Sequence, residues 1–273
     1  MNYKMIVLDM DDTLLLSNNT IGSHTKNALL KAQEKGVKVV LASGRPPAGM
    51  KKYAQELQLK KNGSFILAFN GAEIFDCQSD EELFSSRLSL DNIQELYRIS
   101  QRENVYLHTF VGETIITEKN NPYTEVEGKL NKLPIKEVPN FLEFVKDPVV
   151  KLLMCAEPEK LIQVEKKLKL ELQGRFNIMR SKPFFLEFLE LGVSKGTSIL
   201  QLIKQLGIKI DEVIAVGDSY NDLEMIELAG FGVAMGNAPD DIKEKADFVT
   251  DTNDNEGVAS IVETFILNTN PPQ

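Results

Sequence analysis

Met5-Ile6-Val7-Leu8-Asp9-Met10-Asp11-Asp12-Thr13 is the stretch that decides the fold of this chain. Four successive apolar residues stop abruptly at Asp9, the pattern of a strand that is covered on both faces in a parallel sheet. The same pattern recurs three times: Val37 to Ala42 before Ser43-Gly44-Arg45, Phe65 to Phe69 before Asn70-Gly71, and Val213 to Val216 before Gly217-Asp218. The sequence therefore predicts four buried strands that each end in small or polar residues.

Helical patterns lie between these runs, and a glycine follows each of them. They cover Ser23 to Lys35, Thr197 to Leu206, and Ser219 to Ala229. A glycine just after the last periodic residue is a common helix stop. The alternation of strand and helix predicts an α/β fold with a doubly wound, mostly parallel, Rossmann-like core sheet.

The middle of the chain has a different pattern. A helix from about Leu90 to Arg102 precedes two β-rich runs joined at Gly112-Glu113, which is a hairpin signature, and a second helix follows from Pro158 to Leu172. The strand-then-polar pattern resumes only after Ser194. We therefore predict an α+β domain at residues 84–187, inserted into a core formed by residues 1–83 and 188–273.

Composition limits the classes of function. Hydrophobic residues make up 42% and charged residues 26% of the 273 residues, which is typical of a globular protein. The net charge of −9 argues against a nucleic-acid partner, which would need an excess of Lys and Arg. No apolar run approaches the ~20 residues that span a bilayer, and the opening residues do not resemble a signal peptide. Cys77 and Cys155 have no metal-like spacing and are expected to be buried thiols. We expect a cytoplasmic protein with no membrane partner; the sequence does not indicate its oligomeric state.

The polar residues at the strand ends form a coherent chemical set. In open α/β sheets, ligands bind beyond the carboxyl ends of the strands, so these residues are expected to converge. Asp9 and Asp11 are two residues apart, so an extended chain would direct both carboxylates to one side, and Asp218 would arrive from another strand. Mutual repulsion of three acids is relieved by a hard cation with oxygen ligands, and Mg²⁺ with a substrate phosphate fits best.

Candidate phosphate ligands accompany these acids. Ser43 offers a hydroxyl, and the Ser43-Gly44 backbone offers N–H groups where a helix is expected to begin. Lys195, just before the helical pattern at Thr197, can neutralise charge on Asp9 and on the phosphate. Asn221 can add an amide hydrogen bond. The nucleophile is then a carboxylate that forms an aspartyl-phosphate, which water hydrolyses.

These residues carry a family resemblance that spans nearly the whole chain. Asp9-Met10-Asp11-Asp12-Thr13, Ser43-Gly44-Arg45, Lys195, and Gly217-Asp218 with Asn221-Asp222 resemble the four ordered motifs of the haloacid dehalogenase superfamily. The chain is most similar to the Cof-like phosphatases, whose large α/β cap lies between the second and third motifs. Asn70-Gly71-Ala72 and the stretch from Gly232 to Ala238 are also similar to the pattern of that group.

The resemblance implies a role for each matching residue. Asp9 is implied to be the nucleophile and a metal ligand, Asp11 the acid and base that also ligates Mg²⁺ through its carbonyl, and Asp218 the remaining ligand. The phosphate is implied to be held by Met10 through its backbone and by Ser43, Gly44, Lys195 and Asn221, with support from Thr13, Arg45 and Asp222. Asp12 departs from the pattern, because many relatives have glycine there.

The implied activity is Mg²⁺-dependent hydrolysis of a phosphate monoester of a small soluble metabolite, such as a sugar phosphate or pyridoxal phosphate. A phosphomutase uses similar chemistry but returns the phosphoryl group to a bound substrate. A receiver-like regulatory protein stores the phosphoryl group on an aspartate. Asp11 and the inserted domain favour the phosphatase, because a second carboxylate promotes hydrolysis and an insertion of this size can form a lid. No motif in the sequence indicates the substrate.

Overall fold

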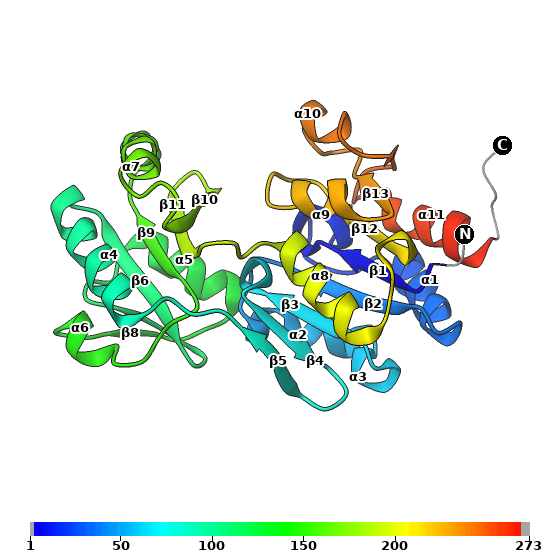
Figure 1. Ribbon diagram of the computed structural model, residues 1–273, viewed down its shortest axis with the longest axis horizontal. Coiled ribbons are helices and arrows are strands. Elements are labelled where there is room, and N and C mark those ends of the chain that lie inside the picture. The colour runs from blue at the N-terminus through cyan, green and yellow to red at the C-terminus, as the bar shows by residue number, and fades with distance from the viewer. Residues whose placement is uncertain (1–2, 269–273) are drawn as a thin grey trace. The chain divides into compact units, whose positions relative to one another are not determined.

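The computed structural model describes residues 3–268 and divides into two compact units (Figure 1). The core unit comprises Met1–Phe84 and Ser194–Gln273, and the inserted unit comprises Ser85–Val193. The predicted end of the insertion, at residue 187, lies inside strand β11 (Phe185–Glu190). That strand pairs with β9 (Leu152–Cys155) of the inserted unit, so the contacts place the division later, after Val193.

The core unit is built on an eight-stranded sheet. Its strand order is β14-β13-β12-β1-β2-β3-β4-β5. The strands are β1 (Met5–Leu8), β2 (Lys38–Ala42), β3 (Phe65–Ala68), β4 (Glu73–Asp76), β5 (Glu81–Ser85), β12 (Val213–Gly217), β13 (Phe231–Ala234) and β14 (Phe248–Val249). Every pairing from β14 to β3 is parallel, and β3 pairs with β4 in antiparallel fashion. The predicted α/β class with a mostly parallel core sheet is confirmed.

Strand β1 lies inside the sheet between β12 and β2, and all four of its residues are fully buried. Met5 and Val7 pack in one cluster with Ile199 and Leu202 of α8 and with Met225 of α9, which explains the unbroken apolar run. The helices of this unit are α1 (Ser23–Glu34), α2 (Pro47–Glu56), α3 (Leu59–Asn62), α8 (Lys195–Leu206), α9 (Leu223–Leu228), α10 (Asp240–Lys243) and α11 (Gly257–Ile261).

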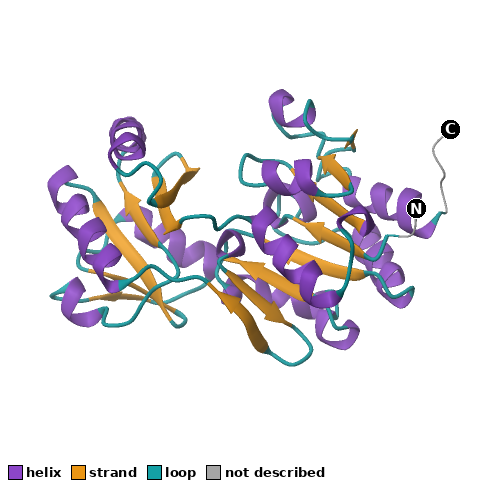
Figure 2. Cartoon of the chain, in the orientation of Figure 1, coloured by secondary structure: helices purple, strands orange, loops and turns teal. Residues whose placement is uncertain are grey.

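The inserted unit has a sheet of its own, flanked by helices (Figure 2). This sheet has six strands, in the order β10-β11-β9-β6-β7-β8. Pairing is antiparallel except between β7 and β8. The remaining elements are β6 (Tyr106–Val111), β7 (Thr114–Thr117), β8 (Ile135–Glu137), β10 (Phe176–Lys182), α4 (Leu90–Glu103), α5 (Pro122–Asn131), α6 (Phe141–Phe144) and α7 (Pro158–Glu171). Leu96 of α4 and Leu161 of α7 share one core with Leu152, Met154 and Leu186 of the sheet. The predicted hairpin and both predicted helices are present.

Several elements were not predicted from the sequence, among them β4, β5, β13, β14 and α5. They are short or lack a clear period, so local pattern does not reveal them. Both cysteines are buried free thiols. Among residues 3–268, no helix is long and apolar enough to cross a membrane.

Candidate active site

The chain turns immediately after β1 instead of continuing as a strand. The Asp9 N–H donates to the carbonyl of Val216 on the neighbouring strand at 3.0 Å, and Met10–Leu14 then form a tight turn. Within it Asp11 is extended (φ −72°, ψ 129°) and Asp12 is left-handed (φ 60°). The carboxylate of Asp9 contacts Lys195, and that of Asp11 contacts Arg45.

The left-handed conformation of Asp12 gives a physical reason for glycine at this position in many relatives. Glycine has no Cβ and adopts positive φ freely, whereas aspartate is among the few other residues that tolerate it. The side-chain amide of Asn237 donates to the Asp12 carbonyl at 2.8 Å, and its oxygen accepts from the Asn253 N–H at 3.0 Å. A loop remote in sequence therefore holds the turn that carries Asp9 and Asp11.

Lys195 is the central cation of the site. It is the first residue of α8, whose N-cap Ser194 forms a capping box with Thr197, and its side chain is completely buried. The Lys195 ammonium donates to Asp9 Oδ1 and, at 2.6 Å, to Asp222 Oδ1. Burial alone lowers the pKa of Lys195, but Asp222 and Asp9 outweigh it and the pKa is raised. Lys195 is therefore charged and bridges two carboxylates from different strand ends.

Asp222 organises the turn after β12. Its Oδ2 accepts from the N–H groups of Asp218 and Ser219, both at 3.0 Å, while its Oδ1 accepts from Lys195. A Cβ on Gly217 would lie 2.4 Å from the Asp222 Cβ, so this approach requires glycine. The helix predicted from Ser219 starts only at Leu223, because residues 218–222 form this turn instead.

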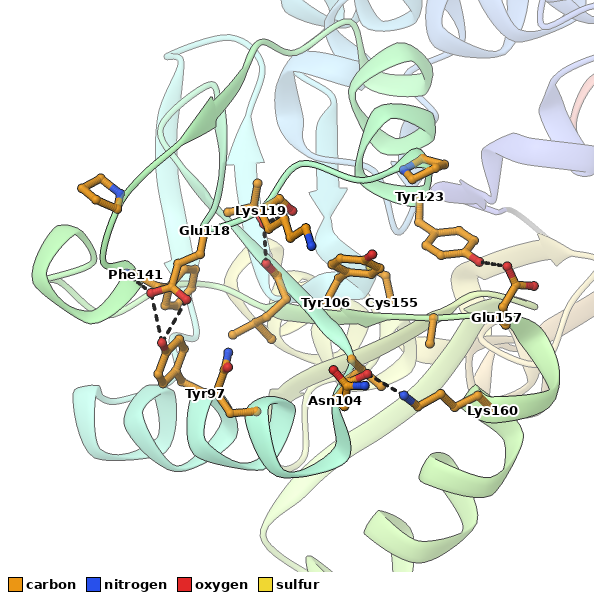
Figure 3. Close-up of a pocket in the computed structure, with 17 residues that line it drawn as sticks. Tyr97, Asn104, Tyr106, Glu118, Lys119, Tyr123, Phe141, Cys155, Glu157 and Lys160 are labelled. Carbon is orange, nitrogen blue, oxygen red and sulfur yellow. Dashed lines mark hydrogen bonds between the residues drawn. The ribbon is translucent and has the colours of Figure 1, made fainter.

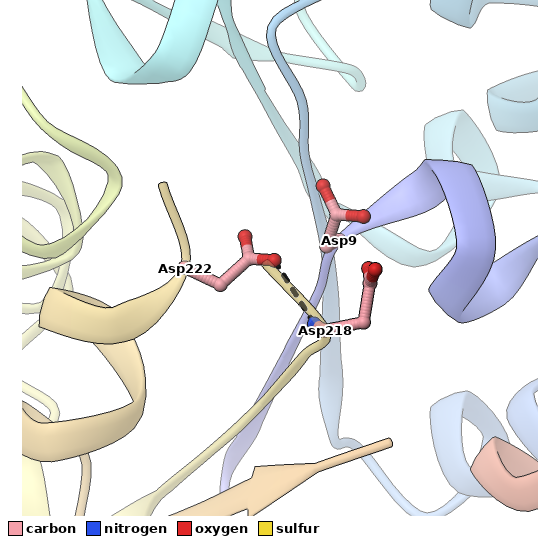
Figure 4. Close-up of side chains that lie close together, drawn as sticks. All are labelled: Asp9, Asp218 and Asp222. Atoms are coloured by element: carbon pink, nitrogen blue, oxygen red, sulfur yellow. Dashed lines mark hydrogen bonds between the residues drawn. The ribbon is translucent and has the colours of Figure 1, made fainter. Parts of the chain in front are cut away.

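The site contains a cluster of three acids that could hold a metal ion. One carboxylate oxygen from each of Asp9, Asp218 and Asp222 lies within 4.8 Å of the other two (Figure 4). Both oxygens of Asp222 already accept protein hydrogen bonds, whereas Asp218 accepts at Oδ1 from the Thr13 hydroxyl at 2.8 Å. Asp9 and Asp218 are therefore the better candidates for side-chain ligands, and Asp222 orients their surroundings.

The electrostatics of the cluster fit a divalent cation. Burial, with the charges of Asp222 and Asp218, raises the pKa of Asp9 well above its ordinary value despite the opposing effect of Lys195. Burial, Asp222 and Asp12 raise the pKa of Asp218 to about 7, against the hydrogen bond from Thr13. One lysine does not neutralise the group, and hard oxygen donors of this kind suit Mg²⁺.

Asp11 is held by Arg45, which follows the Ser43-Gly44 turn. The Arg45 guanidinium donates hydrogen bonds to both carboxylate oxygens of Asp11, and the bond from Nε to Oδ2 is 2.8 Å. Arg45 is almost fully buried, while about half of the Asp11 side chain (45%) is exposed. Burial lowers the pKa of Arg45, but Asp11 and Tyr53 raise it overall. Arg45 thus sets the position of the Asp11 carboxylate.

Of the predicted phosphate ligands, Ser43 and Gly44 lie on the loop after β2, and Asn221 lies on the loop after β12. Helix α2 begins at Pro47 after Pro46, so the helix start expected at Gly44 is not there. The Ser43 hydroxyl accepts from the Arg45 N–H at 3.2 Å, and Asn70 accepts at Oδ1 from the Asn221 amide at 3.0 Å. Met10 is completely buried in the turn after β1.

Asn70 and Asn237 are the positioning residues to which sequence reasoning assigned no role. Both lie in stretches that resemble the family pattern, but only the fold reveals that one orients Asn221 and the other holds the Asp12 carbonyl. The Gly71 backbone has φ 92°, and a Cβ there would lie 2.4 Å from Ser198 Oγ. The start of α8, which carries Lys195, therefore packs directly on this glycine.

The sequence and the fold of this chain are similar to those of known hydrolases and phosphatases. A sequence model of the haloacid dehalogenase-like hydrolases matches residues 6–262. The 5-amino-6-(5-phospho-D-ribitylamino)uracil phosphatase YcsE of Bacillus subtilis is 32% identical, with 97% of both chains covered. A haloacid dehalogenase-like hydrolase from Bacteroides thetaiotaomicron has a TM-score of 0.90 at 42% identity, covering 96% of this chain and 99% of its own. The subclass IIB sugar phosphatase BT4131 has a TM-score of 0.81 at 26% identity, covering 95% and 98%.

Proposed function

Because this chain belongs to the haloacid dehalogenase-like hydrolases and is a phosphatase, we propose that it hydrolyses phosphate monoesters of small metabolites with Asp9 as nucleophile. One observation carries this assignment: the buried Lys195 ammonium joins Asp9 to Asp222 at the carboxyl edge of the parallel sheet. That arrangement keeps a carboxylate oxygen in a fixed position beside a positive charge. Both features favour attack on a phosphoryl group.

The first chemical step transfers the phosphoryl group to the protein. A carboxylate oxygen of Asp9 forms a bond to phosphorus as the ester P–O bond breaks, and Asp11 donates a proton to the departing oxygen. Lys195, with Ser43 and Asn221, binds the phosphoryl oxygens and offsets the charge that develops on them. The Arg45 guanidinium binds both oxygens of Asp11 and so limits the orientations of this carboxylate.

The second step releases phosphate. Asp11, now a carboxylate, removes a proton from water as the water oxygen attacks phosphorus, and the bond to Asp9 breaks. Asp9, Asp218 and the Asp11 carbonyl would hold Mg²⁺ in this proposal. When bound, the ion supplies positive charge to the transferring phosphoryl group. Asp222 supports the site by fixing the Asp218 turn and Lys195.

For the substrate we propose a sugar phosphate or a similar small ester such as pyridoxal phosphate. Two similar proteins support this class, since one is named for a phosphoribityl compound and the other is described as a sugar phosphatase. A cytoplasmic location stays part of the proposal, and the separate buried thiols of Cys77 and Cys155 agree with it.

Release of inorganic phosphate from a panel of sugar phosphates and pyridoxal phosphate tests the proposal, with Mg²⁺ and with chelator. Asp9→Asn should lose turnover by at least about 10³-fold, because an amide is a poor nucleophile. Asp240→Asn is the matched control, since its side chain is 95% exposed on α10. Turnover by Asp9→Asn would remove Asp9 from its role, and a stable phospho-protein without phosphate release would favour a receiver-like protein. Transfer to a second site on the substrate would favour a mutase.

A further inference from the structure

The inserted unit contains a cavity of about 770 Å³ that the proposed chemistry does not use. Its walls come from α4, the start of β6, the segment after β7, the starts of α5 and α6, and the junction of β9 with α7 (Figure 3). Every lining residue belongs to the inserted unit, and none belongs to the acidic cluster. The volume lies within the ~300–1,000 Å³ of small-molecule sites.

Two carboxylates in this cavity are already compensated by neighbouring donors. Glu118 accepts from the Tyr97 hydroxyl at 2.9 Å and from the Phe141 N–H at 2.7 Å. Glu157 accepts from the Tyr123 hydroxyl at 2.6 Å. These bonds lock two tyrosine side chains in place, so the walls are arranged before any ligand arrives. Preorganised walls lower the cost of ordering on binding.

The cavity lining also contains two lysines. The Lys160 ammonium donates to the Asn104 carbonyl at 2.5 Å, and Lys119 lies at the exposed rim. With Glu118 and Glu157, the two lysines give the lining a formal charge of zero. A phosphate or an ammonium ligand would therefore find no excess of opposite charge.

The lining offers both hydrogen-bond donors and acceptors beside aromatic rings. A tyrosine hydroxyl that donates one hydrogen bond can still accept another through its oxygen lone pairs. An ammonium that is bound to one carbonyl can still donate two more hydrogen bonds. The half-buried rings of Tyr97, Tyr106 and Tyr123 add apolar surface. The fitting ligand is uncharged, carries many hydroxyl groups and has a C–H face that packs on aromatic rings.

We propose that this cavity binds an unphosphorylated sugar or a similar polyhydroxylated ring. None of the residues assigned to phosphate hydrolysis lines the cavity, so this proposal does not rest on the role of Asp9.

The composition of the chain provides a local probe for this binding. There is no tryptophan, and three of the six tyrosines (Tyr97, Tyr106 and Tyr123) line the cavity. The full chain is titrated with D-glucose, D-galactose and maltose while tyrosine fluorescence is followed, and saturation-transfer NMR confirms contact. We expect saturation at about 1 mM or below for at least one sugar.

Two cavity variants and a matched control locate the site. Tyr106→Leu should weaken sugar binding by at least about ten-fold. Gln101→Leu, on the exposed side of α4, should weaken it as well and serves if the first variant does not fold. Tyr220→Leu removes a tyrosine that is 65% exposed in the core unit and should bind sugar like the wild type, as should Asp9→Asn. The proposal would be overturned if none of the three sugars gave a saturating signal, or if both cavity variants bound sugar as the wild type does. It would also be overturned if inorganic phosphate or glycine bound more tightly than the sugars and Tyr106→Leu abolished that binding.

Discussion

The raised pKa of Asp218 predicts that its carboxylate destabilises the folded core when no cation is bound, and replacing Asp218 tests this prediction directly. Its pKa is raised from 3.8 to about 7 by burial and by the charges of Asp222 and Asp12. Three pKa units correspond to about 4 kcal/mol, and partial exposure of the side chain halves this to about 2 kcal/mol. Asp218→Asn keeps the oxygen that accepts from Thr13 but removes the charge.

In chelator at pH 8, Asp218→Asn should therefore be more stable than the wild type. About 2 kcal/mol corresponds to a rise in Tm of about 4–8 °C for a unit of this size. The folded carboxyl has the higher pKa, so the wild type loses stability as pH rises from about 4 through 7. The difference between the two proteins should accordingly shrink toward pH 4.

Magnesium should reverse the order of the two proteins. A cation bound by Asp9 and Asp218 at 100 times its Kd stabilises the wild type by about 2.7 kcal/mol, and the variant should lose most of that gain. Differential scanning fluorimetry gives the Tm of each protein in chelator and in Mg²⁺. Asp11→Asn is the control: its carboxylate is paired with Arg45, so its Tm should stay level or fall. A lower Tm for Asp218→Asn in chelator would refute the account of an under-neutralised cluster.

Three further perturbations probe the packing of both units. Lys195→Met leaves two carboxylates without their shared cation and should lower the free energy of unfolding in urea by about 3–5 kcal/mol. Lys204→Met, on the exposed side of the same helix, should lower it little, and equal losses in the two variants would contradict the role of the buried charge. Gly71→Ala places a Cβ 2.4 Å from Ser198 Oγ on a backbone with φ 92°, and it should lower the free energy of unfolding by at least about 1–3 kcal/mol. An unchanged Tm would show that α8 does not need this close approach. Burial and Lys151 lower the pKa of His108 to about 3. The free energy of unfolding of the inserted unit should therefore fall by up to about 1.4 kcal/mol per pH unit as pH falls from 6.5 toward 3, and His108→Gln should remove this slope in acid-unfolding curves.

Local sequence patterns predicted the elements that have a strong period or an unbroken apolar run. The four strands that precede Asp9, Ser43, Asn70 and Asp218 are all present, because a strand covered on both faces needs apolar residues throughout. Helix starts were less predictable. The start expected at Ser219 moved to Leu223, since the Asp222 carboxylate binds the backbone N–H groups of the preceding turn.

The chemical character of the site and the order of its motifs were thus determined by the sequence alone. The sequence also placed Asp9, Lys195 and Asp218 at ends of elements that a parallel sheet brings to one edge. Tertiary structure decided the pairings: Lys195 with Asp9 and Asp222, Arg45 with Asp11, and Asn70 with Asn221. These contacts join residues up to 186 positions apart. Their geometry depends on how distant loops meet in space, and no local preference of the chain encodes that.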